Sequence, residues 1–153
     1  MRSARWLFTG ALLVTVLVYW TGLHGPFVLD DSNNLNPILE WLHGNNSWQL
    51  VLLGNGSGLF GRSLSMATLM LSAWTGGYDP FAFKLGNLFA HLLCGFAGWL
   101  MLRHALARDP HLRRHADVAA ALIAAVWLLH PLNVSTVLYA VQRMAQVSAL
   151  FTL

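Results

Sequence analysis

The sequence predicts an all-α fold, a polytopic bundle of helices in a membrane. Of its 153 residues, 56% are hydrophobic and only 10% are charged, which leaves too few charges to cover a soluble globule. The apolar residues gather in long runs, and the basic residues gather beside those runs. Because the basic clusters lack interleaved aromatic residues, they indicate membrane topology, and no nucleic-acid partner is expected.

The first predicted span covers residues 6–23. About 18 residues make a helix of roughly 27 Å, close to the bilayer core of about 30 Å. Arg2 and Arg5 precede the run, so a cleaved signal peptide is the alternative. The run is longer than a typical signal core, and no small-x-small cleavage site follows it. We therefore expect an uncleaved span with a cytoplasmic N-terminus, followed by an outer loop over residues 24–80.

Within this outer loop, the pattern predicts helices that lie along the membrane surface. Residues 64–74 are apolar, but about 11 residues reach only roughly 17 Å as a helix, too short to cross. A span here would also place the later arginine-rich loop outside, against the positive-inside bias. We expect residues 64–74, and a shorter segment at 36–43, to be interfacial helices.

The second predicted span, residues 81–102, returns to the cytoplasm. It is followed by a loop over residues 103–117 that contains four arginines, and positive loops stay inside. The loop arginines are Arg103, Arg108, Arg113 and Arg114.

The third predicted span covers residues 118–130 and is expected to end near the outer surface at His130-Pro131. Its 12 or so apolar residues reach only about 18 Å, so it either begins earlier or continues, kinked, past Pro131. A fourth apolar segment at 137–153 reaches about half a bilayer before the sequence stops. This predicts that the chain is the N-terminal fragment of a larger protein.

The expected topology brings a set of polar residues to the outer interface. An arginine inside an apolar segment costs about 2.5–3.5 kcal/mol on insertion scales, which makes Arg143 a functional candidate. A carboxylate can accept a hydroxyl proton or hold a divalent cation, and an arginine can neutralise a phosphate. Such groups suit transfer from a lipid-linked phosphate donor to a hydroxyl acceptor. The set consists of Asp30, Asp31, Arg62, His130 and Arg143.

The second span also has a polar stripe. Lys84, Asn87 and His91 follow one another at i, i+3 and i+7, so they share one face of a helix. Polar residues in membrane helices more often form hydrogen bonds between helices than catalyse reactions. We therefore predict a structural role for this stripe.

Taken in order, these motifs resemble the N-terminal part of GT-C superfamily membrane glycosyltransferases of the protein O-mannosyltransferase type, which includes the transmembrane and tetratricopeptide-repeat O-mannosyltransferases. The similarity covers nearly the whole chain. Its departures are Ser63 for a proline, Lys84 for a histidine and Ser135 for a glutamate. The matching residues are Asp30-Asp31 in FVLDD, Arg62-Ser63-Leu64, Asn87 and His91 in FKLGNLFAH, and His130-Pro131 followed by Arg143 in HPLNVSTVLYAVQR.

The resemblance implies an enzyme that transfers a sugar, with inversion, from a polyprenyl-phosphate donor to a hydroxyl of a protein or glycan. It implies Asp30 or Asp31 as the general base, with the choice open, and Arg143, His130 and Arg62 as contacts to the donor phosphate. A divalent cation at the two aspartates also stays open. The implied setting is a bacterial inner membrane with a periplasmic first loop. The alternative is a small non-catalytic membrane protein that acts as an assembly or polysaccharide-export subunit.

Overall fold

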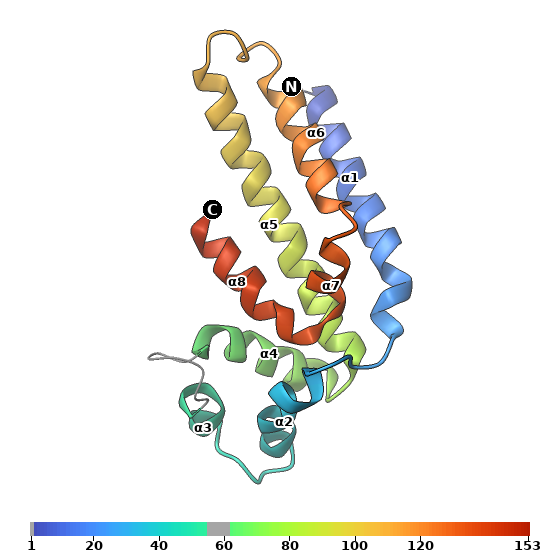
Figure 1. Ribbon diagram of the computed structural model, residues 1–153, viewed down its shortest axis with the longest axis vertical. Helices are drawn as coiled ribbons and strands as arrows, with labels where there is room; N and C mark the ends of the chain where they lie inside the picture. The colour runs from blue at the N-terminus through green and yellow to red at the C-terminus, as the bar shows by residue number, and fades with distance from the viewer. Residues whose placement is uncertain (1, 55–61) are drawn as a thin grey trace.

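The computed structural model describes residues 2–54 and 62–153, and within these ranges every regular element is a helix (Figure 1). This confirms the all-α class. The elements are α1 (Arg2–Trp20), η1 (Thr21–His24), α2 (Asp31–Leu42), α3 (Trp48–Leu53), α4 (Ser63–Gly76), α5 (Pro80–Arg108), α6 (Ala116–Leu128), α7 (Asn133–Leu138), η2 (Ala140–Gln142) and α8 (Arg143–Thr152).

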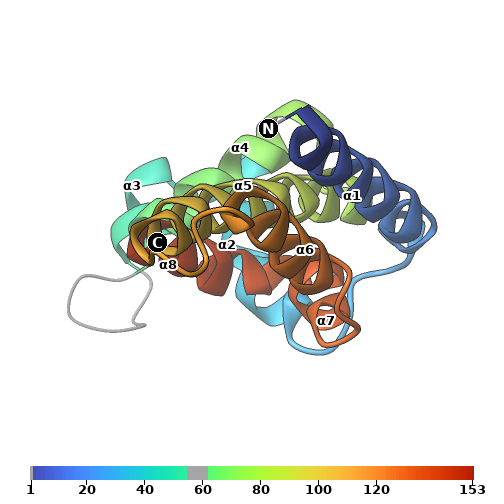
Figure 2. The ribbon, with the colours of Figure 1, turned by 90° about the horizontal axis from the view of Figure 1, so that it is seen from above.

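The helices form a long bundle with a second layer across one end. In Figure 1, α6 lies between α1 and α5, and α2, α3 and α4 lie across the end of α5 at which that helix begins. Figure 2 shows α8 on the opposite side of the bundle from α1. The loop between α5 and α6 and the start of α1 share the other end of the molecule.

Two helical segments, Ser3–His24 and Pro80–Arg108, are long and apolar enough to cross a membrane. The 29 residues of α5 reach roughly 43 Å, which exceeds a bilayer core of about 30 Å. This helix begins sharply because the Asp79 carboxylate accepts a hydrogen bond from the Phe81 N–H at 3.1 Å, with Pro80 at the first helical position. Its length fits the predicted span at 81–102 and carries the helix about one turn and a half further.

Small residues allow the bundle helices to approach closely. Ala120, Ala121 and Ala124 of α6 are buried against Phe8 of α1 and Trp99 of α5. The rings of Phe8 and Trp99 stack with centroids 4.5 Å apart. Close packing of this kind, rather than a large apolar core, is what stabilises helix pairs in lipid.

The third apolar segment forms α6, which ends at Leu128, close to the predicted end at residue 130. The helix breaks at Pro131, which cannot continue the hydrogen-bond ladder, and the Asn133 amide caps α6 by donating to the Trp127 carbonyl at 2.6 Å. The chain then continues through α7, whose Val137 is buried beside Tyr19 and Leu23 at the end of α1 and in η1. The helix therefore ends close to the predicted residue and the chain continues into α7 after a break at exposed residues, and the position of this break relative to a membrane surface stays a prediction.

The layer across the end of the bundle is apolar on both faces of α4. Met66 and Leu69 are buried in the core that this layer shares with α5. Leu71 and Trp74 are exposed, at 57% and 74%. The helix at residues 63–76 thus covers the predicted segment 64–74 and exposes apolar side chains at the surface, while its position in a membrane interface stays a prediction.

Candidate functional site

The two adjacent aspartates diverge at a tight turn. The Asp31 N–H donates to the Val28 carbonyl at 3.2 Å, and Leu29 between them has φ of 53°, a left-handed conformation that is uncommon for leucine. The turn directs the Asp31 side chain inward, where it is fully buried, and leaves Asp30 exposed at the start of α2. The pair therefore presents one accessible carboxylate.

The buried Asp31 carboxylate joins two distant parts of the chain. It accepts backbone N–H bonds from Val28 at 3.2 Å, from Ala140 at 3.2 Å and from Val141 at 3.0 Å. Both carboxylate oxygens thus accept hydrogen bonds from backbone N–H groups, one in the turn before α2 and two in η2. Burial, and secondarily the charge of Asp31, raise the pKa of the nearby Tyr78 phenol. Asp31 is positioned to hold the fold together rather than to take a proton from a ligand.

Arg143 also points inward, with only 4% of its surface exposed. Its Nε donates to Asn87 Oδ1 at 2.6 Å, and its two terminal nitrogens reach acceptors on α4 and α5. All four acceptors that the structure describes for this guanidinium are neutral, so the cation is solvated by the protein. The remaining three are the Thr68 carbonyl at 3.2 Å, Ser72 Oγ at 3.3 Å and the Phe83 carbonyl at 2.6 Å.

Asn87 completes a network around η2. Its amide nitrogen donates to the Tyr139 carbonyl while its oxygen accepts from Arg143. The segment 139–143 is therefore fixed on one side by Asp31 and on the other by Asn87. The network thereby fixes the position of Val141 and Gln142, which line a pocket beside this segment.

The rest of the polar stripe also joins α5 to other segments. The Lys84 ammonium donates to the Gly25 and Pro26 carbonyls at 2.8 and 2.9 Å. His91 forms a 3.0 Å hydrogen bond with the Leu128 carbonyl, and its ring stacks on Trp127 with centroids 4.7 Å apart. These contacts tie α5 to the segment after η1 and to the end of α6.

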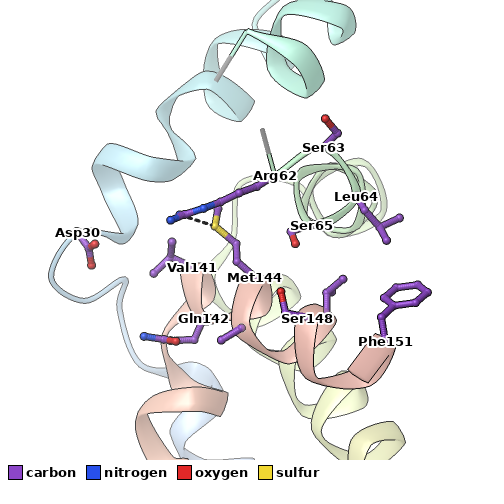
Figure 3. Close-up of a pocket in the computed structure, with 12 residues that line it drawn as sticks. Asp30, Arg62, Ser63, Leu64, Ser65, Val141, Gln142, Met144, Ser148 and Phe151 are labelled. Atoms are coloured by element: carbon purple, nitrogen blue, oxygen red, sulfur yellow. Dashed lines mark hydrogen bonds between the residues drawn. The ribbon is translucent and has the colours of Figure 1, made fainter. Parts of the chain in front are cut away.

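A pocket of about 800 Å³ opens between α4, α8 and the start of α2 (Figure 3). Asp30 lies at one side, and the Arg62 side chain extends from the start of α4 across the opening. The full lining comprises Asp30, Arg62, Ser63, Leu64, Ser65, Val141, Gln142, Met144, Ala145, Val147, Ser148 and Phe151.

The two charged groups in the pocket are available to a ligand. The Arg62 guanidinium donates to the Met144 sulfur at 2.8 Å, and a thioether is a weak acceptor that an oxyanion can replace. Within the described ranges, no carboxylate lies within 4.0 Å of Arg62. The Asp30 carboxylate accepts one side-chain bond, from the Asn34 amide at 3.3 Å. Each group thus keeps hydrogen-bonding capacity toward the pocket.

The two charged groups of the pocket lie on one side of it. Asp30 and Arg62 lie there with Gln142, Val141 and Met144 in Figure 3. Leu64 and Phe151 lie on the side away from Asp30, with Ser63 and Ser65 beside Leu64. The lining therefore offers both charged and apolar contacts, which suits an amphiphilic ligand whose charged group faces Arg62.

His130 lies outside this pocket. It is exposed on the turn between α6 and α7, where its Nδ1 accepts from the Leu132 N–H at 3.3 Å. Pro131 follows it at the break between the two helices. The predicted set therefore divides three ways: Asp30 and Arg62 face the pocket, Asp31 and Arg143 lie behind its wall, and His130 is apart.

Metal binding would need more ligands than the aspartate pair supplies. In the described part of the chain, no group of three or more His, Cys, Asp or Glu residues is arranged to hold a metal ion. The Asp31 oxygens are in addition occupied by backbone donors.

The sequence analysis missed the face of α8 that lines the pocket. Met144, Ser148 and Phe151 lie at i, i+4 and i+7, the spacing of one helical face. This spacing can be read from the sequence. However, the three residues include the polar Ser148, so the pattern does not resemble the apolar stripe of a core helix.

Comparisons of the chain with protein-family models, with curated proteins and with solved structures find no match. The features that bear on function are therefore the pocket, its lining residues and the two helices that are long enough to cross a membrane.

Proposed function

We propose that the chain belongs to a membrane glycosyltransferase that moves a sugar from a polyprenyl-phosphate donor to a hydroxyl acceptor. The observation that carries this proposal is the pocket between α4 and α8, in which an accessible carboxylate, Asp30, and a loosely held guanidinium, Arg62, face one space. The two other candidate charges, Asp31 and Arg143, are buried and engaged.

Asp30 is the general base in this proposal. Its carboxylate takes the proton of the acceptor hydroxyl while the hydroxyl oxygen attacks the anomeric carbon of the sugar. The bond between that carbon and the phosphate oxygen breaks, and the electron pair leaves with the polyprenyl phosphate. A single base with in-line attack gives inversion of configuration.

Arg62 stabilises the leaving phosphate. A guanidinium can donate two parallel hydrogen bonds to a phosphate, which is a far better acceptor than the Met144 sulfur it now contacts. Leu64 and Phe151, on the side of the pocket away from Asp30, suit contact with the first part of a polyprenyl chain. The lining thus offers contacts for both the phosphate and the lipid of the donor.

We further propose that the pocket opens at the outer face of a bacterial inner membrane, with the N-terminus in the cytoplasm. In that orientation the arginines after α5 lie inside, in agreement with the positive-inside bias. The bilayer and a protein or glycan acceptor are then the partners, and α4 lies in the outer interface.

The two roles separate experimentally. We expect Arg62→Gln to weaken the binding of polyprenyl phosphate to the purified chain by about ten-fold or more, because a charged hydrogen bond is lost. We expect Asp30→Asn to leave this binding intact and to lower sugar transfer by roughly 10²–10⁴-fold in membranes that contain the protein, because the base is lost. Binding is measured by titration, and transfer with a labelled polyprenyl-phosphate sugar.

Arg5→Gln is the matched control, since it removes one exposed arginine at the opposite end of the molecule. It should leave both transfer and polyprenyl-phosphate binding in the pocket unchanged. Wild-type affinity in R62Q, or wild-type transfer in D30N, would reject the respective role. Binding without any transfer by the wild-type protein would instead support a non-catalytic subunit.

A further inference from the structure

A second charged surface lies at the end of the molecule opposite the pocket. The turn between α5 and α6, residues 108–115, contains Arg108, Arg113 and Arg114 against a single aspartate, Asp109. All eight residues of this turn, which we call the basic turn, are exposed. The start of α1 lies at the same end of the molecule, where Arg5 is also exposed (Figure 1).

The charges of the basic turn are not neutralised by the protein. The neighbouring Arg103 is paired, because its Nε lies 2.8 Å from Asp117 Oδ1 and its guanidinium carbon lies 5.3 Å from the centre of the Trp99 ring. In the ranges that the structure describes, this is the only ion pair within 4.0 Å. The arginines of the basic turn therefore retain their full capacity for a phosphate.

The basic turn has a defined backbone. The Asp109 carboxylate accepts from the His111 N–H at 2.8 Å, and the Asp109 carbonyl accepts from the Leu112 and Arg113 N–H groups at 3.2 and 2.9 Å. These bonds place Leu112, 46% exposed, directly beside two arginines. An apolar side chain among cations matches the boundary between headgroups and acyl chains.

The position of the basic turn along α5 selects the partner. Arg103, near the end of α5, is paired with Asp117 at the start of α6, and Arg108 lies five residues, about 7.5 Å, further along the helix. With the membrane surface at the level of Arg103, Arg108 lies within a Debye length of it, about 8 Å at physiological salt. An anionic lipid is therefore the nearest source of phosphate.

We propose that the basic turn binds the phosphate groups of anionic phospholipids at the membrane surface opposite the pocket. Arg108, Arg113 and Arg114 bind the headgroups, and Leu112 inserts among them. This site is separate from the proposed sugar transfer and does not depend on it.

The test uses the purified full chain in neutral detergent micelles, titrated with fluorescent phosphatidylglycerol and, separately, with fluorescent phosphatidylcholine. We expect the wild type to prefer phosphatidylglycerol by about ten-fold or more, since each arginine near a surface contributes about 1 kcal/mol. The variant R108Q/R113Q/R114Q should lose this preference, and the variant R108K/R113K/R114K should retain it. Micelles avoid any effect of these residues on membrane insertion.

An equal preference in the wild type and the glutamine variant would overturn the proposal. Inorganic phosphate is the competitor that tests the source of the ligand: it should fail to displace phosphatidylglycerol at equal concentration, and displacement would show a soluble-anion site instead. Wild-type preference that persists at 1 M salt, where the Debye length falls to about 3 Å, would also contradict an electrostatic contact. The polyprenyl-phosphate affinity of the pocket should be the same in all three proteins.

Discussion

Positions 30 and 31 carry the same side chain in opposite environments, and the backbone causes the difference. The left-handed conformation of Leu29 turns the chain so that Asp31 meets the N–H groups of η2 while Asp30 remains in the pocket opening. A residue held at positive φ costs of order 1–3 kcal/mol and persists when its surroundings compensate. Here the compensation comes from the three hydrogen bonds to Asp31.

This division predicts unequal effects on stability. Replacing Asp31 by alanine leaves three backbone donors without their acceptor, and each unsatisfied buried group costs about 1–3 kcal/mol. We expect D31A to lower the free energy of unfolding by about 3 kcal/mol or more, and D31N, which keeps one oxygen, to lower it by less. The measurement is thermal unfolding in detergent, followed by tryptophan fluorescence.

Asp30→Ala is the control for this comparison, because it removes an exposed carboxylate from the adjacent position. It should change the stability by less than about 1 kcal/mol, as surface substitutions usually do. Equal losses in D30A and D31A would show that the two side chains do not differ in burial as described.

At the scale of a helix, α5 contains glycines with different surroundings. A Cβ built on Gly86 would overlap the guanidinium of Arg143, so the missing side chain is what makes room for the buried cation. A Cβ on Gly98 meets nothing within 4 Å. One helix thus offers a glycine that packing requires and one that it does not.

Glycine-to-alanine substitutions should therefore have opposite signs on the same helix. Gly98→Ala should stabilise the protein by up to about 1 kcal/mol, because alanine is the better helix former. Gly86→Ala should lower the free energy of unfolding despite the same gain in propensity, because the guanidinium must leave its acceptors. Thermal unfolding of both variants checks this, and equal changes in G86A and G98A would contradict the position of Arg143.

Helices that form because their own residues are apolar could be predicted from the sequence. Helix boundaries that depend on contacts with distant residues could not. The runs that became α1 and α5 are long and apolar, and the shorter run that became α4 is apolar as well. The short α3 was missed, although Ser47 before it is an N-cap that accepts from the Leu50 N–H at 3.3 Å. The early start of α2 at Asp31 depends on a turn whose geometry includes contacts to η2, 109 residues away.

At the scale of the whole molecule, the sequence identified the charged residues of the site but not their division into accessible and buried. Asp30 and Arg62 were among the candidates, and they do face one pocket. Nothing local distinguishes Asp30 from Asp31, or shows that Arg143 finds four neutral acceptors on α4 and α5. Such roles follow from tertiary structure, as does the position of His130 at the exposed break between α6 and α7.

The orientation in the membrane gives the last prediction. The start of α2 and α4, which line the pocket, lie at the end of the bundle opposite the basic turn (Figure 1). A span through α5 therefore puts the start of α2 and the basic turn on opposite sides of the bilayer. Ser32 and His111 are exposed at these two ends, and the single native cysteine, Cys94, is buried. In intact cells, a membrane-impermeant maleimide should label S32C and should label H111C only after the membrane is opened. The wild-type protein, with Cys94 alone, should stay unlabelled in both conditions. Labelling of S32C and H111C to the same extent in intact cells would exclude a single crossing between the two ends, and labelling of H111C alone would reverse the proposed orientation.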